Sequence, residues 1–338
     1  MRFVTGIVLV LAAVGGCTST PIKPVDPGNR FTSRPPVDLK SIDPPTRFNA
    51  AAAAPLEVST NADEVLLHGT TAVVPIHGSK PTVSSGEEIR LIDTRTNKVR
   101  EVIKPTYPQP RIGTVIALPT LTSVQGRPTV LAPFLGEAPG QGTTPGRPLV
   151  EVVSIDPENG KTDWRTEIPI EGWTGTGRSS GVEVSFAGVA DGVGVDRIVD
   201  PSLSARRGDT YALDLSSRKV RWSMRGFEAR AVAAGMVTGQ QSGTGQTPKV
   251  QVRGIDAQTG SWLWSITKGG GRLVPLVTGA CHGVVYGRTA NGPVVLDGRT
   301  GTDRETQPGV APSVVNSSMA IGPWPGGGLG SSSYPVIG

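Results

Sequence analysis

The chain has 338 residues, 45 of them Gly and 30 Pro, and a formal net charge of +5. Aromatic residues make up only 5% and no long helical pattern of apolar residues is present, which favours a loop-rich, all-β protein over a helical bundle. No stripe of Lys or Arg interleaved with aromatic residues occurs, which excludes nucleic acid as the expected partner.

The N-terminal residues have the pattern of an export signal. Met1 and Arg2 give a charged start, Phe3 to Val14 is mostly apolar, and two glycines lead to Cys17. The apolar stretch is too short to span a bilayer as a helix, which takes about 20 apolar residues. A charged start followed by a short apolar core and small residues is typical of a cleaved leader, so we expect residues 1–16 to be a signal peptide.

Cys17 directly follows Val14-Gly-Gly, a sequence that resembles the lipobox of bacterial lipoproteins. That resemblance implies a diacylglyceryl group on the Cys17 thiol and cleavage before this residue, with the bilayer as the partner of the lipid. Each buried methylene of such a lipid contributes about 0.8 kcal/mol, so two or three chains anchor a protein durably. An ordinary signal peptide with an incidental Cys is the alternative.

Residues 17–55 are expected to form a linker that begins with the lipidated Cys. The stretch from Thr18 to Pro55 holds eight prolines and no periodic apolar pattern. Proline removes backbone donors and favours extended polyproline II, so the segment is predicted to be a semi-rigid tether.

From residue 56 onward, one short phrase returns five times. It consists of an aliphatic residue, an Asp, three spacer residues and a turn-forming position. The Asp residues are 93, 156, 214, 256 and 297, at steps of 63, 58, 42 and 41 residues, and the turn positions are Asn97, Gly160, Arg218, Gly260 and Gly301. A period near 40 in strand-rich units predicts a β-propeller.

The fourth copy shows how one unit is expected to fold. Residues 249–255 alternate polar and apolar side chains, as a half-buried strand does. Asp256 to Gly260 supplies turn chemistry, and residues 261–266 form a second strand rich in aromatic and branched residues. Trp264 stands eight residues after the Asp and is expected to pack against the neighbouring unit. Trp164 and Trp222 occupy the same place in their copies, whereas Glu101 and Glu305 replace the Trp in the outer ones.

The phrase from Ile255 to Trp264 resembles the repeat of the pyrroloquinoline-quinone-like (PQQ-like) propellers, aliphatic-Asp-x-x-Thr-Gly-x-x-x-Trp. The copy at Ile155 fits nearly as well. The resemblance covers residues 56–338 and implies an all-β propeller of four-stranded, PQQ-like blades. Many non-enzymatic envelope lipoproteins carry such blades, so the motif implies the fold and no particular cofactor.

We expect six blades, with seven as the alternative because the first two steps between Asp residues are long. The limits of the six units are 61–104, 110–168, 180–227, 230–268, 272–306 and 310–338. The excess length is assigned to Gly-rich loops at 136–147 and 239–248. Closure of the ring is expected to use residues 56–59 or 64–76 beside the last unit.

Residues with catalytic or metal-binding patterns are few. Gly177 to Gly181 matches Gly-x-Ser-x-Gly but lacks the strand–turn–helix context of a nucleophile elbow. Cys281 is expected to be a small buried strand residue, with a nucleophile paired to His282 as the disfavoured alternative. His68 and His77 are interpreted as loop residues, and the three His show no metal-ligand spacing. Two stretches are weak calcium candidates: Asp156 to Gly160, and an acidic loop of Asp191, Asp196 and Asp200.

Quinone-dependent dehydrogenases are the enzymes that the resemblance brings into question. They have larger eight-blade propellers, an adjacent disulfide and a calcium site with a catalytic Asp. This chain is shorter, has no adjacent cysteines and offers no matching Asp. We therefore assign no catalytic, cofactor-binding or metal-binding residue and expect no cofactor.

The expected function is that of a non-catalytic module that binds another envelope protein on the extracytoplasmic side of the cell membrane. Loops at one face of the propeller, or the edge of a blade, would contact the partner. The candidate contact residues are Trp173, Arg178, Arg206, Arg207 and Arg230. The alternative is a solute-binding or hydrolytic propeller that uses its central channel.

Overall fold

The computed structural model describes the chain over most of residues 65–335. The described ranges are 65–76, 87–109, 115–140, 142–143, 145–170, 182–200, 207–241, 251–267, 272–281, 283–305, 311–312, 314–315, 319–323 and 331–335. These ranges contain β-strands and turns without a helix, so none of their segments is a helix able to cross a membrane. The expected signal peptide (1–16) and linker (17–55) lie outside the described residues.

The strands form six sheets, and in five of them each strand pairs with the next one along the chain. The first sheet contains β1 (Leu66–His68), β2 (Thr71–Ile76), β3 (Glu88–Asp93) and β4 (Lys98–Ile103). The second contains β6 (Thr120–Val124), β7 (Arg127–Ala138), β8 (Arg147–Ile155) and β9 (Thr162–Pro169). The third contains β10 (Val182–Ala190), β11 (Val193–Asp200), β12 (Arg207–Asp214) and β13 (Lys219–Met224), with β5 (Val115–Leu118) added parallel to β10.

The remaining sheets follow in chain order. The fourth contains β14 (Phe227–Ala233), β15 (Met236–Gln241), β16 (Gln251–Asp256) and β17 (Trp262–Thr267). The fifth contains β18 (Leu276–Cys281), β19 (Val284–Thr289), β20 (Gly292–Asp297) and β21 (Asp303–Glu305). The sixth has three strands: β22 (Val314–Val315), β23 (Met319–Pro323) and β24 (Ser331–Pro335).

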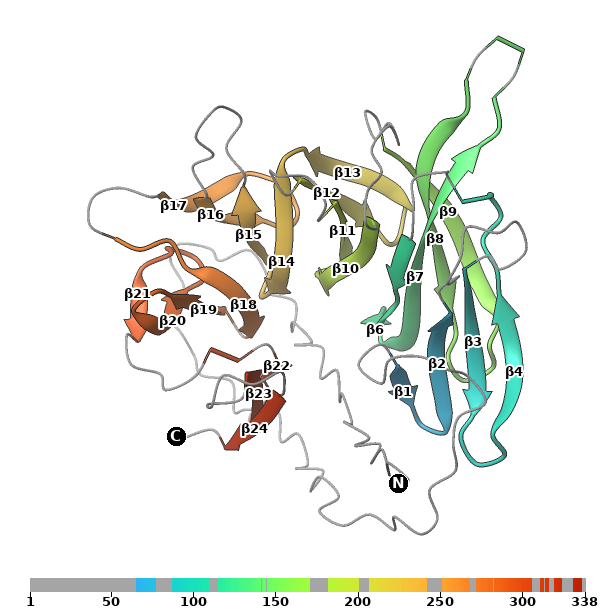
Figure 1. Cartoon of the computed structure of the whole chain (residues 1–338), viewed down its shortest axis with the longest axis horizontal. Coiled ribbons are helices and arrows are strands. Elements are labelled where there is room, and N and C mark those ends of the chain that lie inside the picture. Colours follow the sequence, from blue (N-terminus) through green and yellow to red (C-terminus); the bar gives the residue numbers. More distant parts are fainter. Residues whose placement is uncertain are drawn as a thin grey trace, which may run out of the picture.

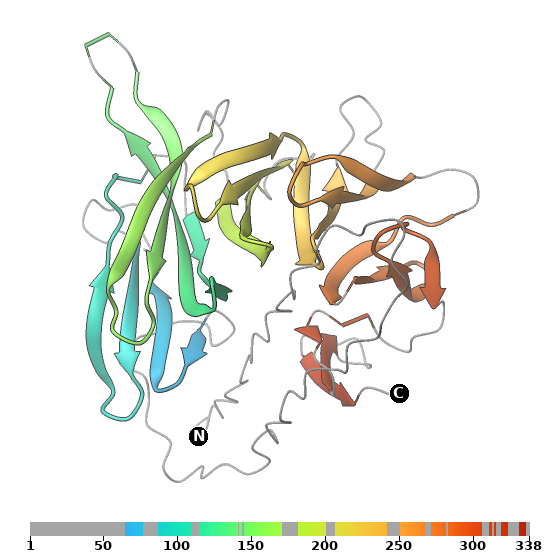
Figure 2. The same ribbon diagram turned by 180° about the vertical axis from the view of Figure 1, so that it is seen from behind.

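The sheets succeed one another around a common centre, with last strands such as β4, β9, β17 and β21 on the outside (Figures 1 and 2). This is the arrangement of a β-propeller, and it confirms the expected all-β fold built from four-stranded units. Five of the six units expected from the sequence each coincide with one sheet to within a few residues. The second, expected at 110–168, does not, because its sheet begins at Thr120 and β5 (Val115–Leu118) belongs to the third sheet. The choice between six and seven blades stays a prediction.

The repeated phrase forms the same turn in every copy, between the third and fourth strands of a sheet. In the fourth sheet, the Asp256 Oδ1 accepts hydrogen bonds from the backbone N–H of Gln258 and Thr259, at 3.0 and 2.8 Å. The turn position then has a positive φ, which is 71° at Gly260 and 61° at Arg218. The Asp carboxylate therefore offsets the strain that a non-Gly residue such as Arg218 brings to this position.

A β-bulge follows each of these turns. In the fourth sheet, Ile255 pairs with Trp262 whereas Gly254 pairs with Trp264, so Leu263 is the extra residue. The register shifts at the same place in the other four sheets that carry the phrase, and the extra residues there are Arg100, Asp163, Arg221 and Arg304. The bulge turns the residue after it, the eighth after the Asp, toward the next sheet.

The Trp at that position docks on the turn of the next sheet, as the sequence predicts. The indole Nε1–H of Trp222 donates to the Ala257 carbonyl at 2.9 Å, and that of Trp264 donates to the Gly298 carbonyl at 2.5 Å. Arg218 lies over the Trp164 ring with its Cζ 5.8 Å from the centroid. Glu101 takes the equivalent place beside Gly160 in the second sheet. A chain of such contacts joins the first five sheets.

The hydrophobic core lies between neighbouring sheets and is divided into clusters. One cluster joins Leu91 of the first sheet to Phe134 of the second, and another joins Val150 of the second to Leu213 of the third. Further clusters join the third to the fourth sheet and the fourth to the fifth. Because the second, third and fourth sheets bury apolar side chains on both faces, the stack is the stable unit.

One expectation about strands is wrong, and the limits of two expected loops change. Residues 66–76 do not pair with the last sheet, because β1 and β2 form the first sheet with β3; residues 56–59 lie outside the described ranges. The loop assigned to 136–147 is shorter than expected, because Gly136 to Ala138 extends β7 and pairs with the start of β8 at Arg147. In the stretch assigned as a loop at 239–248, Gly239 to Gln241 belongs to β15, and residues 242–248 lie outside the described ranges.

Candidate functional site

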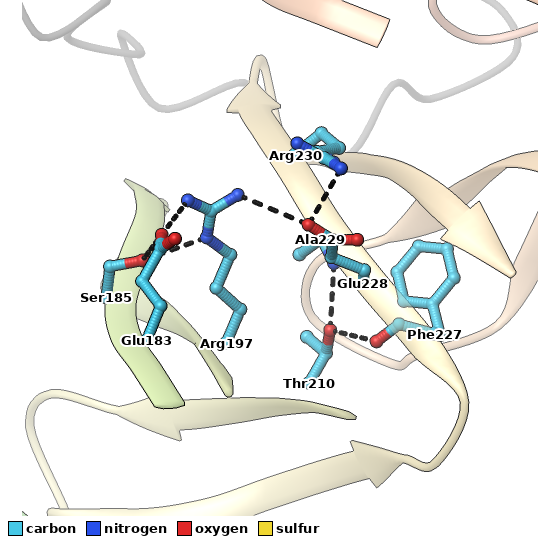
Figure 3. Close-up of polar contacts among 8 residues, drawn as sticks. All are labelled: Glu183, Ser185, Arg197, Thr210, Phe227, Glu228, Ala229 and Arg230. Carbon is cyan, nitrogen blue, oxygen red and sulfur yellow. Dashed lines mark hydrogen bonds and ion pairs between the residues drawn. The ribbon is translucent and has the colours of Figure 1, made fainter. Parts of the chain in front are cut away.

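A network of charged side chains joins the first strands of the third and fourth sheets (Figure 3). The Arg197 guanidinium on β11 forms an ion pair with Glu183 on β10, and its Nε donates to the Ser185 Oγ at 2.8 Å. Across the sheet boundary, Glu228 on β14 lies 3.7 Å from the Arg197 Nη1 and 2.9 Å from the Arg230 Nη2. Glu228 is buried, and it holds both guanidinium groups.

Thr210 fixes the backbone of β14 beside this network (Figure 3). Its hydroxyl donates to the Phe227 carbonyl at 2.7 Å and accepts from the Ala229 N–H at 3.0 Å. Gly208 supports the same approach, because a Cβ at this position would lie 2.6 Å from the Glu228 Cβ. The close spacing of β12 and β14 places Glu228 within reach of Arg197.

The charged groups of the network pair with one another and hold the third and fourth sheets together. The Ser185 hydroxyl donates to the Glu183 Oε1 at 3.1 Å, but that carboxylate is paired with Arg197. Nucleophilic catalysis by a Ser needs a general base able to take its proton. The arrangement therefore favours positioning of the two sheets over catalysis.

We expect Glu228→Gln to lower the free energy of unfolding by about 2–4 kcal/mol, because it leaves two partly buried guanidinium groups without their shared, buried carboxylate. Urea unfolding followed by Trp fluorescence measures this loss. The control is Glu167→Gln, whose carboxylate pairs with Arg147 near the surface and whose loss costs about 1 kcal/mol or less. Equal losses for the two variants would contradict the bracing role of Glu228.

The structure describes two of the five candidate contact residues, Arg207 and Arg230. Arg230 belongs to the network and pairs with Glu228. Arg207 begins β12, opposite Asp200 of β11. Trp173, Arg178 and Arg206 lie outside the described residues. The network and Arg207 lie at the same end of the third sheet, where β10 and β12 begin.

The acidic loop predicted at Asp191, Asp196 and Asp200 is not a loop. Asp196 and Asp200 belong to β11, and Asp191 lies in the turn before it with a φ of 48°. The other calcium candidate is the repeated turn: the Asp156 Oδ1 accepts from the Glu158 N–H at 2.8 Å. Within the described ranges, no cluster of three or more His, Cys, Asp or Glu side chains could hold a metal ion.

The remaining candidates are placed as follows. Cys281 ends β18 and is buried, which confirms its interpretation as a small core residue. His68 is wrong as a loop residue, because it ends β1, where its Nε2 lies 3.7 Å from the Glu158 Oε1. His77, His282 and the Gly177–Gly181 motif lie outside the described residues.

Two carboxyl groups are buried in surroundings that the sequence did not indicate. Burial raises the pKa of Glu87, just before β3, to about 8, with the Gln109 side chain opposing the rise. Asp196 is fully buried, opposite Phe186 and Tyr211 in its sheet, and burial raises its pKa well above the ordinary value. Both groups therefore favour the neutral form in the folded protein.

The network residues that sequence reasoning missed are strand residues, and the ion pairs of Arg197 join it to segments distant along the chain. Glu183 and Glu228 alternate with apolar neighbours, as exposed polar residues of any half-buried strand do, and Arg197 follows another charged residue, Asp196. Their pairing depends on which sheets are adjacent and on the register of β11 against β10. No signal in the sequence indicated them, because Arg197 falls within the stretch predicted to be an acidic loop and Glu228 falls between the units expected at 180–227 and 230–268.

Comparisons with known proteins found similar chains among solved structures only. No protein-family model and no curated protein matches the chain. A europium-containing methanol dehydrogenase is 14% identical, with 74% of this chain and 51% of that chain covered and a TM-score of 0.43. A quinohemoprotein alcohol dehydrogenase of Pseudomonas putida HK5 is 12% identical, with 71% and 41% covered and a TM-score of 0.43. The Dos1 propeller is 11% identical, with 69% and 53% covered and a TM-score of 0.39. The chain spans about half the length of these solved structures.

Proposed function

We propose that the chain is a non-catalytic propeller that binds another protein of the cell envelope and is held at the extracytoplasmic side of the membrane by a lipid on Cys17. The observation that carries this proposal is the distribution of side chains between the inside and the outside of the ring. The buried charges between the third and fourth sheets pair with one another, whereas exposed apolar side chains gather on outer strands.

Five of the seven large apolar side chains exposed in the described residues lie on the last strand of their sheet. They are Val99 and Val102 of β4, Val220 of β13, and Trp262 and Leu263 of β17. Last strands present unpaired backbone groups as well, and proteins use such edges to add a strand from a partner. The outer surface of the ring thus offers both apolar contact and backbone hydrogen bonds.

The lipid on Cys17 supplies the second part of the proposal. Its support is the sequence alone: a short leader, Cys17 directly after two glycines, and a Pro-rich segment before the first sheet. A tether of this kind raises the local concentration of the propeller near partners in the same membrane. The chain would thereby act as an adaptor and not as an enzyme.

Chemical crosslinking in cells, followed by detergent extraction and mass spectrometry, tests this function. We expect one reproducible envelope partner in the unmodified protein and its loss in Cys17→Ala, because the untethered protein no longer concentrates at the membrane. Cys281→Ala is the matched control: it removes the other cysteine of the chain, which is buried in β18, and should retain the partner.

The outcome that contradicts the proposal is a membrane-bound protein that crosslinks to no partner. Attention would then turn to the central channel and to a solute-binding or hydrolytic function. Thermal-shift measurements with small molecules separate the two, since a solute receptor gains stability from its ligand and an adaptor does not.

A further inference from the structure

An exposed Trp covers a buried Arg on the outer strands of the fourth sheet. Trp262 is 59% exposed although it is the first residue of β17. The Arg253 guanidinium on β16 lies under its ring, with the Cζ 3.5 Å from the ring centroid. Arg253 itself is only 7% exposed. A Trp side chain that is mostly exposed to water while it stacks on a buried Arg guanidinium is an uncommon arrangement for both residue types.

Arg253 has no acidic partner among the described residues. Its Nε and Nη2 donate to the Gln251 Oε1, at 3.2 and 2.7 Å, and its buried Nη1 has no hydrogen-bond partner. Burial also lowers the pKa of this guanidinium from its ordinary value. A buried charge without a counter-charge is costly, and a carboxylate that accepts from Nη1 would satisfy it.

The edge of β17 lies beside this pair. β17 is the last strand of its sheet, and the bulge at Leu263 leaves that side chain 46% exposed. In the first and third sheets, the bulged residue is an Arg that binds the next turn: Arg100 to the Glu158 carbonyl at 2.8 Å, and Arg221 to the Gln258 Oε1 at 2.5 Å. In the fourth sheet an apolar, exposed Leu stands instead, so its edge differs from theirs.

We infer that this edge of the fourth sheet binds an extended segment of a partner protein, which adds to β17 as a further strand and places an Asp or Glu carboxylate on the Arg253 guanidinium. Trp262 rotates outward to admit the carboxylate, because its ring is exposed and free of the core, and side-chain rotations of this kind are common on binding. Leu263 provides apolar contact. The inference rests on the proposed function and names the chemistry of the partner.

Two capped pentapeptides of alternating pattern probe the site in the purified full-length chain. One has the sequence Thr-Val-Asp-Val-Thr, and the other has Asn in place of Asp. We expect the Asp peptide to bind about ten-fold more tightly, since hydrogen bonds between charged groups are worth more than neutral ones. Its binding should also shift the Nε–H resonance of Arg253 in ¹H–¹⁵N spectra, a readout that needs no variant.

Arg253→Met should abolish the preference for Asp, and Arg253→Lys should retain part of it because the charge remains. Arg221→Met is the control: its guanidinium pairs with Asp214, 2.7 Å away, in the third sheet, and its loss should leave the preference unchanged. Equal affinities of the two peptides, or an Arg253 resonance that neither peptide moves, would overturn the inference. These measurements use the purified chain and are independent of the crosslinking in cells. If the Asp peptide shows no preference but a partner crosslinks in cells, only the proposed site at Arg253 is rejected. If the Asp peptide is preferred but no partner crosslinks in cells, only the adaptor function is rejected.

Discussion

Replacing Gly301 with Ala is expected to lower the free energy of unfolding by about 3 kcal/mol, roughly three times the effect of the same replacement at Gly126. Gly301 is the turn position of the fifth sheet and has a φ of 68°. A Cβ there would lie 2.5 Å from the Cδ2 of Trp264, which docks from the fourth sheet. The Ala variant therefore suffers two penalties. One is the backbone strain of a positive φ, and the other is overlap of the new Cβ with the Trp264 ring, which the core holds in place.

Gly126 separates these two causes. It has a φ of 79°, and a Cβ added to it would meet nothing within 4 Å. The Ala variant at this position thus reports backbone strain alone, about 1 kcal/mol. Urea unfolding of both variants, with the slope against urea compared as well as the midpoint, makes the measurement. Similar losses for Gly301→Ala and Gly126→Ala would show that Trp264 does not dock on this turn.

Replacing Glu87 with Gln is expected to make the protein more stable at pH 8 by on the order of 3 kcal/mol and to change little at pH 4. The pKa of Glu87 is raised from the ordinary 4.5 to about 8 in the folded protein because the carboxyl is buried. The unfolded chain releases its proton near pH 4.5, whereas the folded chain keeps it until about pH 8. The stability linked to this group is therefore full below pH 4.5 and is lost as the pH rises to 8.

The control for this prediction is the neighbouring Glu88→Gln. The Glu88 carboxylate accepts from the Arg90 Nε at 2.6 Å, so its removal takes away an ion pair and relieves no buried charge. Thermal or urea unfolding at a series of pH values between 4 and 9 compares the three proteins. A pH dependence that is unchanged in Glu87→Gln would show that this carboxyl is not the buried, protonated group described above.

The local features of the fold were predictable because they depend on residues close together in the chain. The Asp of each phrase bonds backbone groups two and three residues on, so Asp256 and Gly260 define their turn without help from the rest of the protein. The docking of Trp264 followed as well, because the period fixed which units are neighbours.

The features that escaped prediction depend on register and on contacts between distant segments. The bulge at Leu263 is visible only as a shift in the pairing of β16 with β17. The parallel addition of β5 to β10 joins residues that lie more than sixty positions apart. The ion pairs of Arg197 with Glu183 and Glu228 need three strands of two sheets to be placed first. Periodicity says which residues are polar, and it leaves open which of them meet.

The adaptor function depends most directly on the chemical state of Cys17. Mass spectrometry of the N-terminal peptide of the protein isolated from bacterial membranes determines that state. We predict a mature chain that begins at Cys17 and carries the mass of a diacylglyceryl group on its thiol, with Cys17→Ala absent from the membrane fraction. A chain that keeps residues 1–16, or one cleaved elsewhere with an unmodified Cys17, would contradict a lipid-anchored propeller.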